Sequence, residues 1–452
     1  MKKHVDLLNG AILPALGSLA LPIMATSLIQ MAYNLIDMIW IGGLGSDAVA
    51  AVGAAGMFMW LSNGLATLAK MGGQIKVAHA LGANSKKEAA GYAKSSLQMG
   101  IVFALLFGVA SILFADQMIG FFQLNSEKVI SDAKYYLMIT CGLVIFSFVN
   151  QIMTGILTAM GNSKASFVAT AIGLVLNIVL DPLFIFGWGV IPAMGVAGAA
   201  IATVLAQVIV MLVFFYVMKQ DIMLFPDVHI LGKPQRAYLL DIFRIGLPTA
   251  LQSMLFSGIS MVIARLIAGW GDGAVAVQKV GSQIESISWM SAEGYAAALN
   301  SFVAQNYGAG NPERVKHGYR ISMKVMLLWG VFCSLVLILC PQWIFQIFLH
   351  EEEILPLGVD YLRILGYSQL FMCMEITTAG AFNGLGKTFP PSIVGITLTS
   401  ARIPLAMVLS SMMGLNGIWW AITISSICKG LVLFGWFLYD LKKPSILLRS
   451  VC

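Results

Sequence analysis

Residues 11–45 read AILPALGSLALPIMATSLIQMAYNLIDMIWIGGLG, an apolar run with a single acidic residue, Asp37. The run is long enough to cross a hydrocarbon layer of about 30 Å as a helix, which takes about 20 residues. A carboxylate at membrane depth costs about 2.5–3.5 kcal/mol by insertion scales. The stretch therefore predicts a membrane-spanning helix in which Asp37 has a function or a partner.

The whole chain has the composition of an integral membrane protein. Of its 452 residues, 59% are hydrophobic and only 11% are charged, whereas soluble domains carry about 25% charged residues. The short segments of alternating polarity that build a membrane β-barrel do not occur, so we predict an all-α protein with twelve transmembrane helices. The apolar runs predict spans at 12–41, 48–74, 90–114, 133–160, 165–187, 195–218, 246–270, 274–304, 321–346, 357–382, 390–412 and 415–440.

Basic residues fall in alternate connections between these spans, with Lys128 and Lys134 as the exceptions. Such an asymmetry follows the positive-inside rule and predicts that both termini are cytoplasmic. The net charge of +6 therefore reflects orientation in the bilayer, and we expect no nucleic-acid partner. The basic connections include Lys2, Lys76, Lys164, Lys233, Arg314, Lys387 and Lys442.

An internal repeat relates the two halves of the chain. LALPIMATSLIQ in the first half matches IGLPTALQSMLFSG in the second, which aligns Pro22 with Pro248, and Gly45 aligns with Gly271. Both pairs have the same separation in sequence, since 248 − 22 equals 271 − 45. Because an even number of spans separates the copies, the halves are parallel repeats. The predicted organisation is an N-terminal six-helix lobe at 1–218, a cytoplasmic linker at 219–245 and a C-terminal six-helix lobe at 246–452.

Polar residues gather in three of the first six spans. The first span carries four of them at i, i+3, i+4 and i+7, the spacing of one helical face, and the fifth span carries two at i and i+4. Neighbouring carboxylates in a low-dielectric site can share a proton, and the same oxygens are ligands suited to Na⁺. A hydrogen-bond network that only joins helices is the alternative. The residues are Gln30, Tyr33, Asn34, Asp37, Asn177, Asp181 and Thr203.

The second half lacks the first carboxylate, because the residue that matches Asp37 is Ile263. Its own acids are Glu285 and Glu293 on the eighth span and Glu375 on the tenth. Glu285 and Glu293 are two turns apart, which predicts that they share a face. These acids form either ion pairs in a polar core or contacts with a cationic substrate.

The combination of motifs resembles the multidrug and toxic compound extrusion (MATE) family over essentially the whole chain, and most of all its branch of DNA-damage-inducible (DinF-like) relatives. Besides the opening stretch and the repeat, LNIVLDPLFIFG followed by MGVAGAAIAT carries the resemblance, as does QIESISWMSAEGYAAALNSFVAQNYGAGNPER in the second half. The resemblance implies a secondary active antiporter that exports lipophilic or cationic compounds in exchange for H⁺ or Na⁺. It also implies a monomer in a prokaryotic inner membrane.

The resemblance also implies roles for individual residues. Residues that match Asp37, Asn177, Asp181 and Thr203 couple transport to a cation in similar transporters, and the one that matches Tyr33 bonds the first carboxylate. Pro22 would bend the first helix when Asp37 changes protonation. The alternative is a static kink, which is common in membrane helices.

A lipid-linked oligosaccharide flippase of the same superfamily is the alternative function. It would favour a lobe rich in Arg and Lys, whereas embedded cations such as Arg402 and Lys429 are few. The stretch NGLGKT echoes a phosphate-binding loop but has Ala381 where that motif needs glycine. We therefore expect no ATP site, no cofactor and no resident metal, and no enzymatic activity.

Overall fold

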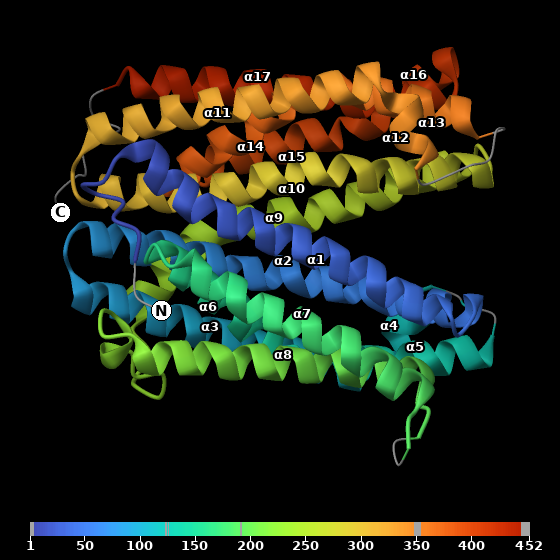
Figure 1. Cartoon of the computed structure of the whole chain (residues 1–452), viewed down its shortest axis with the longest axis horizontal. Helices are drawn as coiled ribbons and strands as arrows, with labels where there is room; N and C mark the ends of the chain where they lie inside the picture. The colour runs from blue at the N-terminus through green and yellow to red at the C-terminus, as the bar shows by residue number, and fades with distance from the viewer. Residues whose placement is uncertain (1–3, 123, 125, 190–191, 348–353, 444–452) are drawn as a thin grey trace. The chain divides into compact units, whose positions relative to one another are not determined.

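The computed structural model describes residues 4–122, 124, 126–189, 192–347 and 354–443, and helices make up most of this part of the chain (Figure 1). The first half contains α1 (Ile12–Gly42), α2 (Ser46–Gly82), α3 (Lys86–Leu113), α4 (Ala115–Gly120), α5 (Glu127–Thr140), α6 (Ile145–Ala159), α7 (Ser163–Phe186) and α8 (Gly195–Gln220). A short 3-10 helix, η1 (Phe225–Asp227), follows. The second half contains α9 (Arg236–Ala268), α10 (Asp272–Gly308), α11 (Pro312–Leu339), α12 (Pro341–Gln346), α13 (Leu355–Gly366), α14 (Gln369–Gly384), α15 (Phe389–Ser400), α16 (Arg402–Met413) and α17 (Leu415–Leu441).

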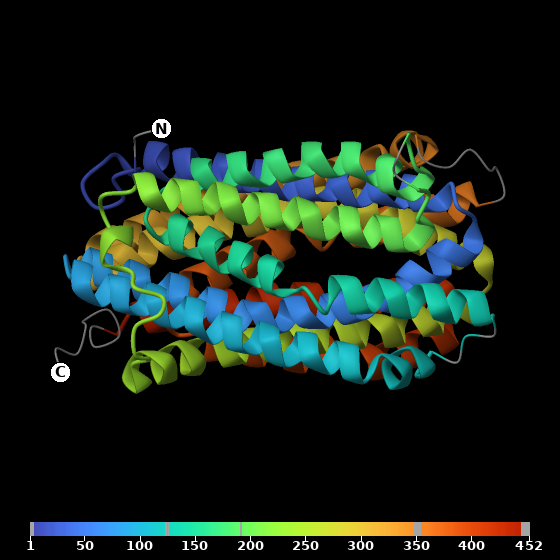
Figure 2. The same ribbon diagram turned by 90° about the horizontal axis from the view of Figure 1, so that it is seen from below.

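Several membrane crossings consist of two helices. Within the described residues, nine segments are long and apolar enough to cross a bilayer, and the pair α5–α6, bent by 47° at its break, makes a tenth (Figure 2). The α10 helix and the α13–α14 pair complete twelve crossings, six in each half. The α10 helix is more polar than the nine apolar segments because it carries Lys279, Glu285 and Glu293. The predicted all-α fold of two six-helix lobes is confirmed.

The chain divides into two compact units, and it changes unit inside two helices. Unit 1 comprises Met1–Val5 and Ala25–Ala250, and unit 2 comprises Asp6–Met24 and Leu251–Cys452. The change inside α1 comes two residues after Pro22, and the change inside α9 comes two residues after Pro248. The repeat therefore extends to the points at which the chain passes from one unit to the other.

Equivalent turns of the repeat have the same unusual backbone. Gly45 and Gly271, which precede α2 and α10, have φ angles of 106° and 102°, a conformation open essentially to glycine alone. Asn84 (φ 56°) and Gly310 (φ 69°) follow the same two helices, and their separation (310 − 84) equals that of Gly45 and Gly271 (271 − 45). Asparagine is the residue that best tolerates the left-handed region after glycine, so both copies make the same turn.

Helix packing inside each unit repeats as well. In unit 1, α2 packs against α3 and α6, and in unit 2, α10 packs against α11 and α14 (Figure 1). The α7 helix lies along α8, as α16 lies along α17, and α8 also contacts α5. Residues on the facing sides of α5, α7 and α8 therefore share one interior.

The connection between the halves is anchored to unit 1. A carboxylate oxygen of Asp241 accepts hydrogen bonds from Lys76 Nζ at 3.0 Å and from the Tyr92 hydroxyl at 2.8 Å. Gln98 Nε2 donates to the carbonyls of Ile230 (2.8 Å) and Gly232 (2.7 Å). The α9 helix begins ten residues before the span predicted at 246, because its first turns are polar and bind α2 and α3.

Candidate functional site

Two hydrogen bonds each join a pair of the polar residues predicted on the first, fifth and sixth spans. The hydroxyls of Tyr33 on α1 and Thr203 on α8 lie 3.3 Å apart. On α7, Asn177 Nδ2 donates to Asp181 Oδ1 at 3.1 Å, one helical turn away. Asn177 and Asp181 are buried, with relative exposures of 1% and 0%, so this pair lies in the interior of unit 1.

Asp37 joins this group through the packing of α1 on α7. The rings of Trp40 and Phe186 meet edge to face with centroids 6.3 Å apart, about one helical turn beyond Asp37 and Asp181. Asp37 and Asp181 are close enough to interact electrostatically. The structure therefore brings Tyr33, Asp37, Asn177, Asp181 and Thr203 into one region of unit 1.

Three oxygens of this group have no hydrogen-bond donor among the described residues. They are Asp37 Oδ1, Asn177 Oδ1 and Asp181 Oδ2, and all three are buried. Buried acceptors in proteins nearly always have a partner. A proton on either carboxylate would create a donor, and a small hard cation would bind carboxylate and amide oxygens directly. The arrangement is thus suited to a proton or to Na⁺, while no group of three or more His, Cys, Asp or Glu that could hold a metal ion occurs within the described ranges.

The other two polar residues of the predicted α1 face lie elsewhere. Gln30 and Asn34 are exposed, whereas Tyr33 and Asp37 are half-buried. Successive residues of an α-helix turn by about 100°, so all four side chains lie within about 100° of one another around α1. Their different exposure therefore comes from what packs against α1 at each turn and not from rotation around the helix. The predicted face therefore divides into a buried pair and an exposed pair.

Two further residues, Tyr136 and Gln207, lie beside this group and were not predicted from the sequence. Tyr136 of α5 is buried and lies near Tyr33, Asp37 and Asp181. Gln207 helps to line a cavity of about 30 Å³ together with Thr203, at the break between α5 and α6, and such a volume holds a water molecule rather than a drug. Gln207 follows Thr203 by one helical turn, a spacing that could have identified it; no local signal marks Tyr136.

The acids of the second half lie in a separate polar network in unit 2. Glu285 accepts a hydrogen bond from Gln369 Nε2 at 3.1 Å and one from the Tyr361 hydroxyl at 3.5 Å. Glu375 forms an ion pair of 3.0 Å with Lys429, and both side chains are almost buried. Glu285 and Glu375 thus bind donors that come from α13, α14 and α17.

Glu293 and Glu285 lie on different sides of α10. Glu293 is exposed, whereas Glu285 is half-buried, because eight residues at about 100° each leave the two side chains about 80° apart around the helix. The buried cation Arg402 donates to the hydroxyls of Ser425 at 2.9 Å and Ser426 at 3.0 Å. No carboxylate lies within ion-pair distance of Arg402 in the described part of the chain.

Comparison with known proteins identifies the family. A model of the MatE family matches residues 22–183 and again residues 248–408. The chain belongs to the MatE family. The two matches begin at Pro22 and Pro248, the residues that the internal repeat aligns, and the predicted MATE resemblance is confirmed.

Curated relatives match this MatE protein over most of their length. It is 30% identical to a probable multidrug resistance protein NorM of Thermotoga maritima, over 89% of this chain and 87% of the relative. It is 24% identical to the multidrug export protein MepA of Staphylococcus haemolyticus, over 96% and 95% respectively. The DinF-like branch stays a prediction.

Solved structures share the whole fold. An outward-facing multidrug resistance MATE transporter of the MOP superfamily superposes with a TM-score of 0.90 at 26% identity, over 100% of both chains. A MATE structure described as being in the bent conformation has a TM-score of 0.89 at 27% identity, over 98% of both chains. This MatE protein therefore shares the fold of these transporters over 98–100% of the chain.

Proposed function

We propose that this MatE protein is a secondary active antiporter that exports lipophilic or cationic compounds in exchange for H⁺ or Na⁺ by alternating access. Relatives named as multidrug resistance and multidrug export proteins support the export of drugs. The observation that carries the coupling is the set of unpartnered, buried oxygens on Asp37, Asn177 and Asp181. Other buried acceptors of the described residues also lack a partner, but the carboxylate oxygens among them are only Asp37 Oδ1 and Asp181 Oδ2. A carboxylate is the group that can take up a proton or bind Na⁺.

The proposed exchange follows from competition for negative charge. When Asp37 and Asp181 are both ionised, the buried site favours a cation, whether a lipophilic drug or a coupling ion. A proton or Na⁺ that arrives from outside neutralises this charge and removes the attraction for the drug. A ligand shifts a conformational equilibrium only through its different affinity for the two states, so the two ligands favour opposite states of the transporter.

Pro22 is proposed as the point at which α1 bends. Proline has no N–H, so the helix lacks the hydrogen bond from position 22 to the carbonyl of Ser18. The chain passes from unit 2 to unit 1 two residues after Pro22. This supports a bend here, because α1 must change its shape if the two units move independently. Related MATE structures are described as bent and straight, which is a property of those proteins.

The acids of unit 2 are proposed to affect substrate choice rather than ion coupling. Glu375 is neutralised by Lys429, and Glu285 already has two donors. The same ion pair argues against the flippase alternative, because it occupies Lys429, one of the two buried cations, with Arg402, in the described part of the chain, so Lys429 is not available for a pyrophosphate. Glu293, Gln30 and Asn34 are exposed and remain candidates for contact with substrate.

The predicted topology belongs to this proposal as well. We place both termini in the cytoplasm and the protein, as a monomer, in the inner membrane of a prokaryote. The structure accounts for one exception to the charge rule, because Lys134 forms an ion pair with Asp116 and its charge is compensated. The lobes are proposed at 1–218 and 246–452, with the linker at 219–245.

Transport in proteoliposomes tests the proposal and identifies the ion. The probe is ethidium, a fluorescent lipophilic cation, with a pH gradient or a Na⁺ gradient imposed separately. Ethidium movement driven by either gradient supports antiport, and the gradient that drives it identifies the coupling ion. If neither gradient accelerates ethidium movement above that of protein-free vesicles, the antiport proposal is wrong.

A further inference from the structure

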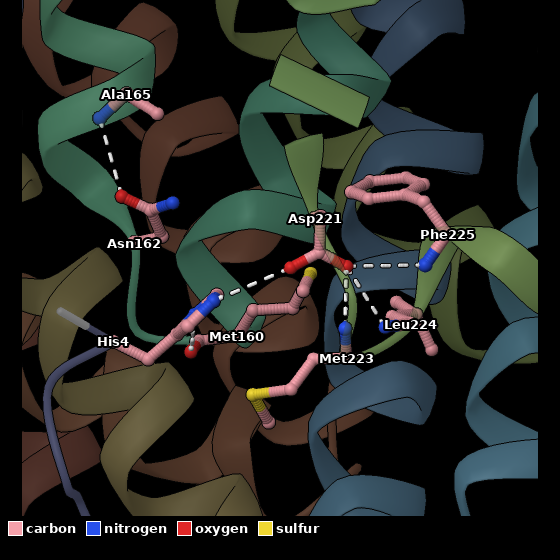
Figure 3. Close-up of polar contacts among 8 residues, drawn as sticks. All are labelled: His4, Met160, Asn162, Ala165, Asp221, Met223, Leu224 and Phe225. Atoms are coloured by element: carbon pink, nitrogen blue, oxygen red, sulfur yellow. Dashed lines mark hydrogen bonds and ion pairs between the residues drawn. The ribbon is translucent and has the colours of Figure 1, made fainter. Parts of the chain in front are cut away.

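The first described residues of the chain bind the end of the first half. His4 Nδ1 lies 3.1 Å from the carbonyl of Met160, at the end of α6, and His4 Nε2 lies 3.3 Å from Asp221 Oδ1, just after α8 (Figure 3). The neighbouring Val5 N–H donates to the carbonyl of Gly161 at 3.0 Å. All of these contacts are inside unit 1.

Both acceptors are satisfied at once only by a protonated His4. A neutral imidazole has a single N–H, whereas the charged ring has two, and here a carbonyl and a carboxylate oxygen face the two ring nitrogens. The other carboxylate oxygen of Asp221 is fixed, since it accepts the backbone N–H groups of Met223, Leu224 and Phe225 at 2.8–3.2 Å (Figure 3). The backbone N–H groups therefore hold the Asp221 carboxylate in place, and whether His4 binds both acceptors depends on the charge of His4.

The next residues of the chain are anchored in unit 2. The buried Leu7 offers its carbonyl to Asn306 Nδ2 at 3.0 Å and to the Arg314 guanidinium at 3.3 Å. Arg314 also donates to the carbonyl of Gly10. Asp6 Oδ1 accepts the N–H groups of Leu8 and Asn9, both at 2.9 Å, and so fixes the turn in between.

The chain passes from unit 1 to unit 2 between Val5 and Asp6. One short segment thus has an anchor in each unit, and only the unit 1 anchor contains a group that titrates near neutral pH. We propose that residues 4–10 form a pH-responsive tether, which holds unit 1 while His4 is protonated, releases it when His4 is neutral, and thereby slows transport at acidic pH. The inference rests on the proposed alternating access, because a tether matters only where the units move.

The direction of the pH effect follows from the surroundings of His4. The hydrogen bond to Asp221 raises the pKa of His4 above its usual 6.5 and outweighs the opposing effect of burial. Burial raises the pKa of Asp221, but its hydrogen bonds from His4, Leu224 and Phe225 outweigh that and leave it below the usual value. A group whose pKa is raised stabilises the folded contact below its unfolded pKa, and the stabilisation is lost as the pH rises through the folded pKa.

Other charged groups lie on the elements near His4 but form no ion pair with it among the described residues. Lys164 lies in the first turn of α7, Lys219 in the last turn of α8, and Asp227 in η1. Within the described ranges, none of these three forms an ion pair with His4, whose ionic partner is Asp221. The anchor is therefore expected to be closed from about pH 4, the usual pKa of an aspartate, to the raised pKa of His4 and open at higher pH.

Hydrogen exchange of the Val5 amide measures the anchor directly, without transport. In the full-length protein in nanodiscs, we expect its protection, corrected for the intrinsic rate, to fall about tenfold between pH 6 and pH 8.5, as loss of a charge-assisted hydrogen bond implies. His4→Gln and Asp221→Asn should have low protection at both pH values, and Asn still offers an acceptor to the turn. His229→Gln is the matched control, because His229 is exposed on the same connection and should behave as wild type.

Ethidium transport at fixed gradients then tests the consequence. The rate of ethidium transport by wild type and by His229→Gln should increase as the pH on the side of the N-terminus rises from 6 to 8.5. The rate of His4→Gln should not show this increase. Equal Val5 protection in wild type and His4→Gln would overturn the anchor. Altered protection with identical transport profiles would overturn the tether. If no variant transports ethidium, the proposed function fails, and the exchange data still decide the anchor.

Discussion

Replacing Asp181 with asparagine separates the coupling role of the site from its effect on stability. The amide keeps the shape of the side chain and can still accept the hydrogen bond from Asn177, but it can neither carry a proton nor attract a cation. It also adds an N–H₂ donor to the group of residues that contains the unpartnered oxygens of Asp37 and Asn177. Function and stability should therefore change in opposite directions.

The structure sets the size of both effects. An unsatisfied buried polar group costs about 1–3 kcal/mol, so one new donor should raise the free energy of unfolding by about 1 kcal/mol. The entropy of unfolding scales at about 2.1 cal/mol/K per residue, so a chain of this length should melt about 1 °C higher. Ion-driven ethidium export should fall at least about 100-fold, to the level of passive leak, because an amide does not titrate.

The assays are thermal unfolding of the purified protein and ethidium export from proteoliposomes. Asp360→Asn is the matched control, since Asp360 also bonds an asparagine, Asn416, but lies in unit 2; it should keep ion-driven export. Ion-driven export by Asp181→Asn within twofold of wild type would refute the coupling role of the α7 carboxylate. A melting temperature that falls by several degrees would refute the reasoning about unpartnered oxygens.

Three further outcomes follow from individual contacts. Thr203→Ala removes one neutral hydroxyl bond and should slow ion-driven export by about tenfold at most, consistent with a neutral hydrogen bond of about 0.5–1.5 kcal/mol; complete loss of export would contradict this. Lys429→Met leaves Glu375 buried without its partner and should destabilise the protein by about 3–5 kcal/mol in denaturant unfolding, while Glu375→Gln in the same background should restore part of that loss; no rescue would mean that the pair is not the cause. Pro22→Ala restores a helical hydrogen bond and should leave ethidium affinity at pH 8 unchanged while flattening its dependence on pH between 5 and 8; an unchanged pH profile, measured by fluorescence binding, would exclude a bend at this residue.

Much of the fold was decided by local features of the sequence. Three features can be recognised without coordinates: apolar runs of membrane length, alternate basic connections, and a repeat with one constant offset between its copies. They can be recognised because a bilayer imposes length and polarity on each helix separately. The pairing of Asn177 with Asp181 was legible for the same reason, since residues one turn apart on a helix are neighbours.

Contacts between distant residues were decided by the tertiary structure alone. Tyr33 meets Thr203 across 170 positions, and His4 meets Met160 across 156; no periodicity encodes such distances. The sequence placed Gln30, Tyr33, Asn34 and Asp37 on one face, but only helix packing decided which pair is buried. Hydropathy showed that Glu375 needed a partner, and only the approach of α17 to α14 identified Lys429. Sequence determines where a buried charge must be compensated, and packing chooses the compensating group, because burial penalises the unpaired ion whichever residue supplies the opposite charge.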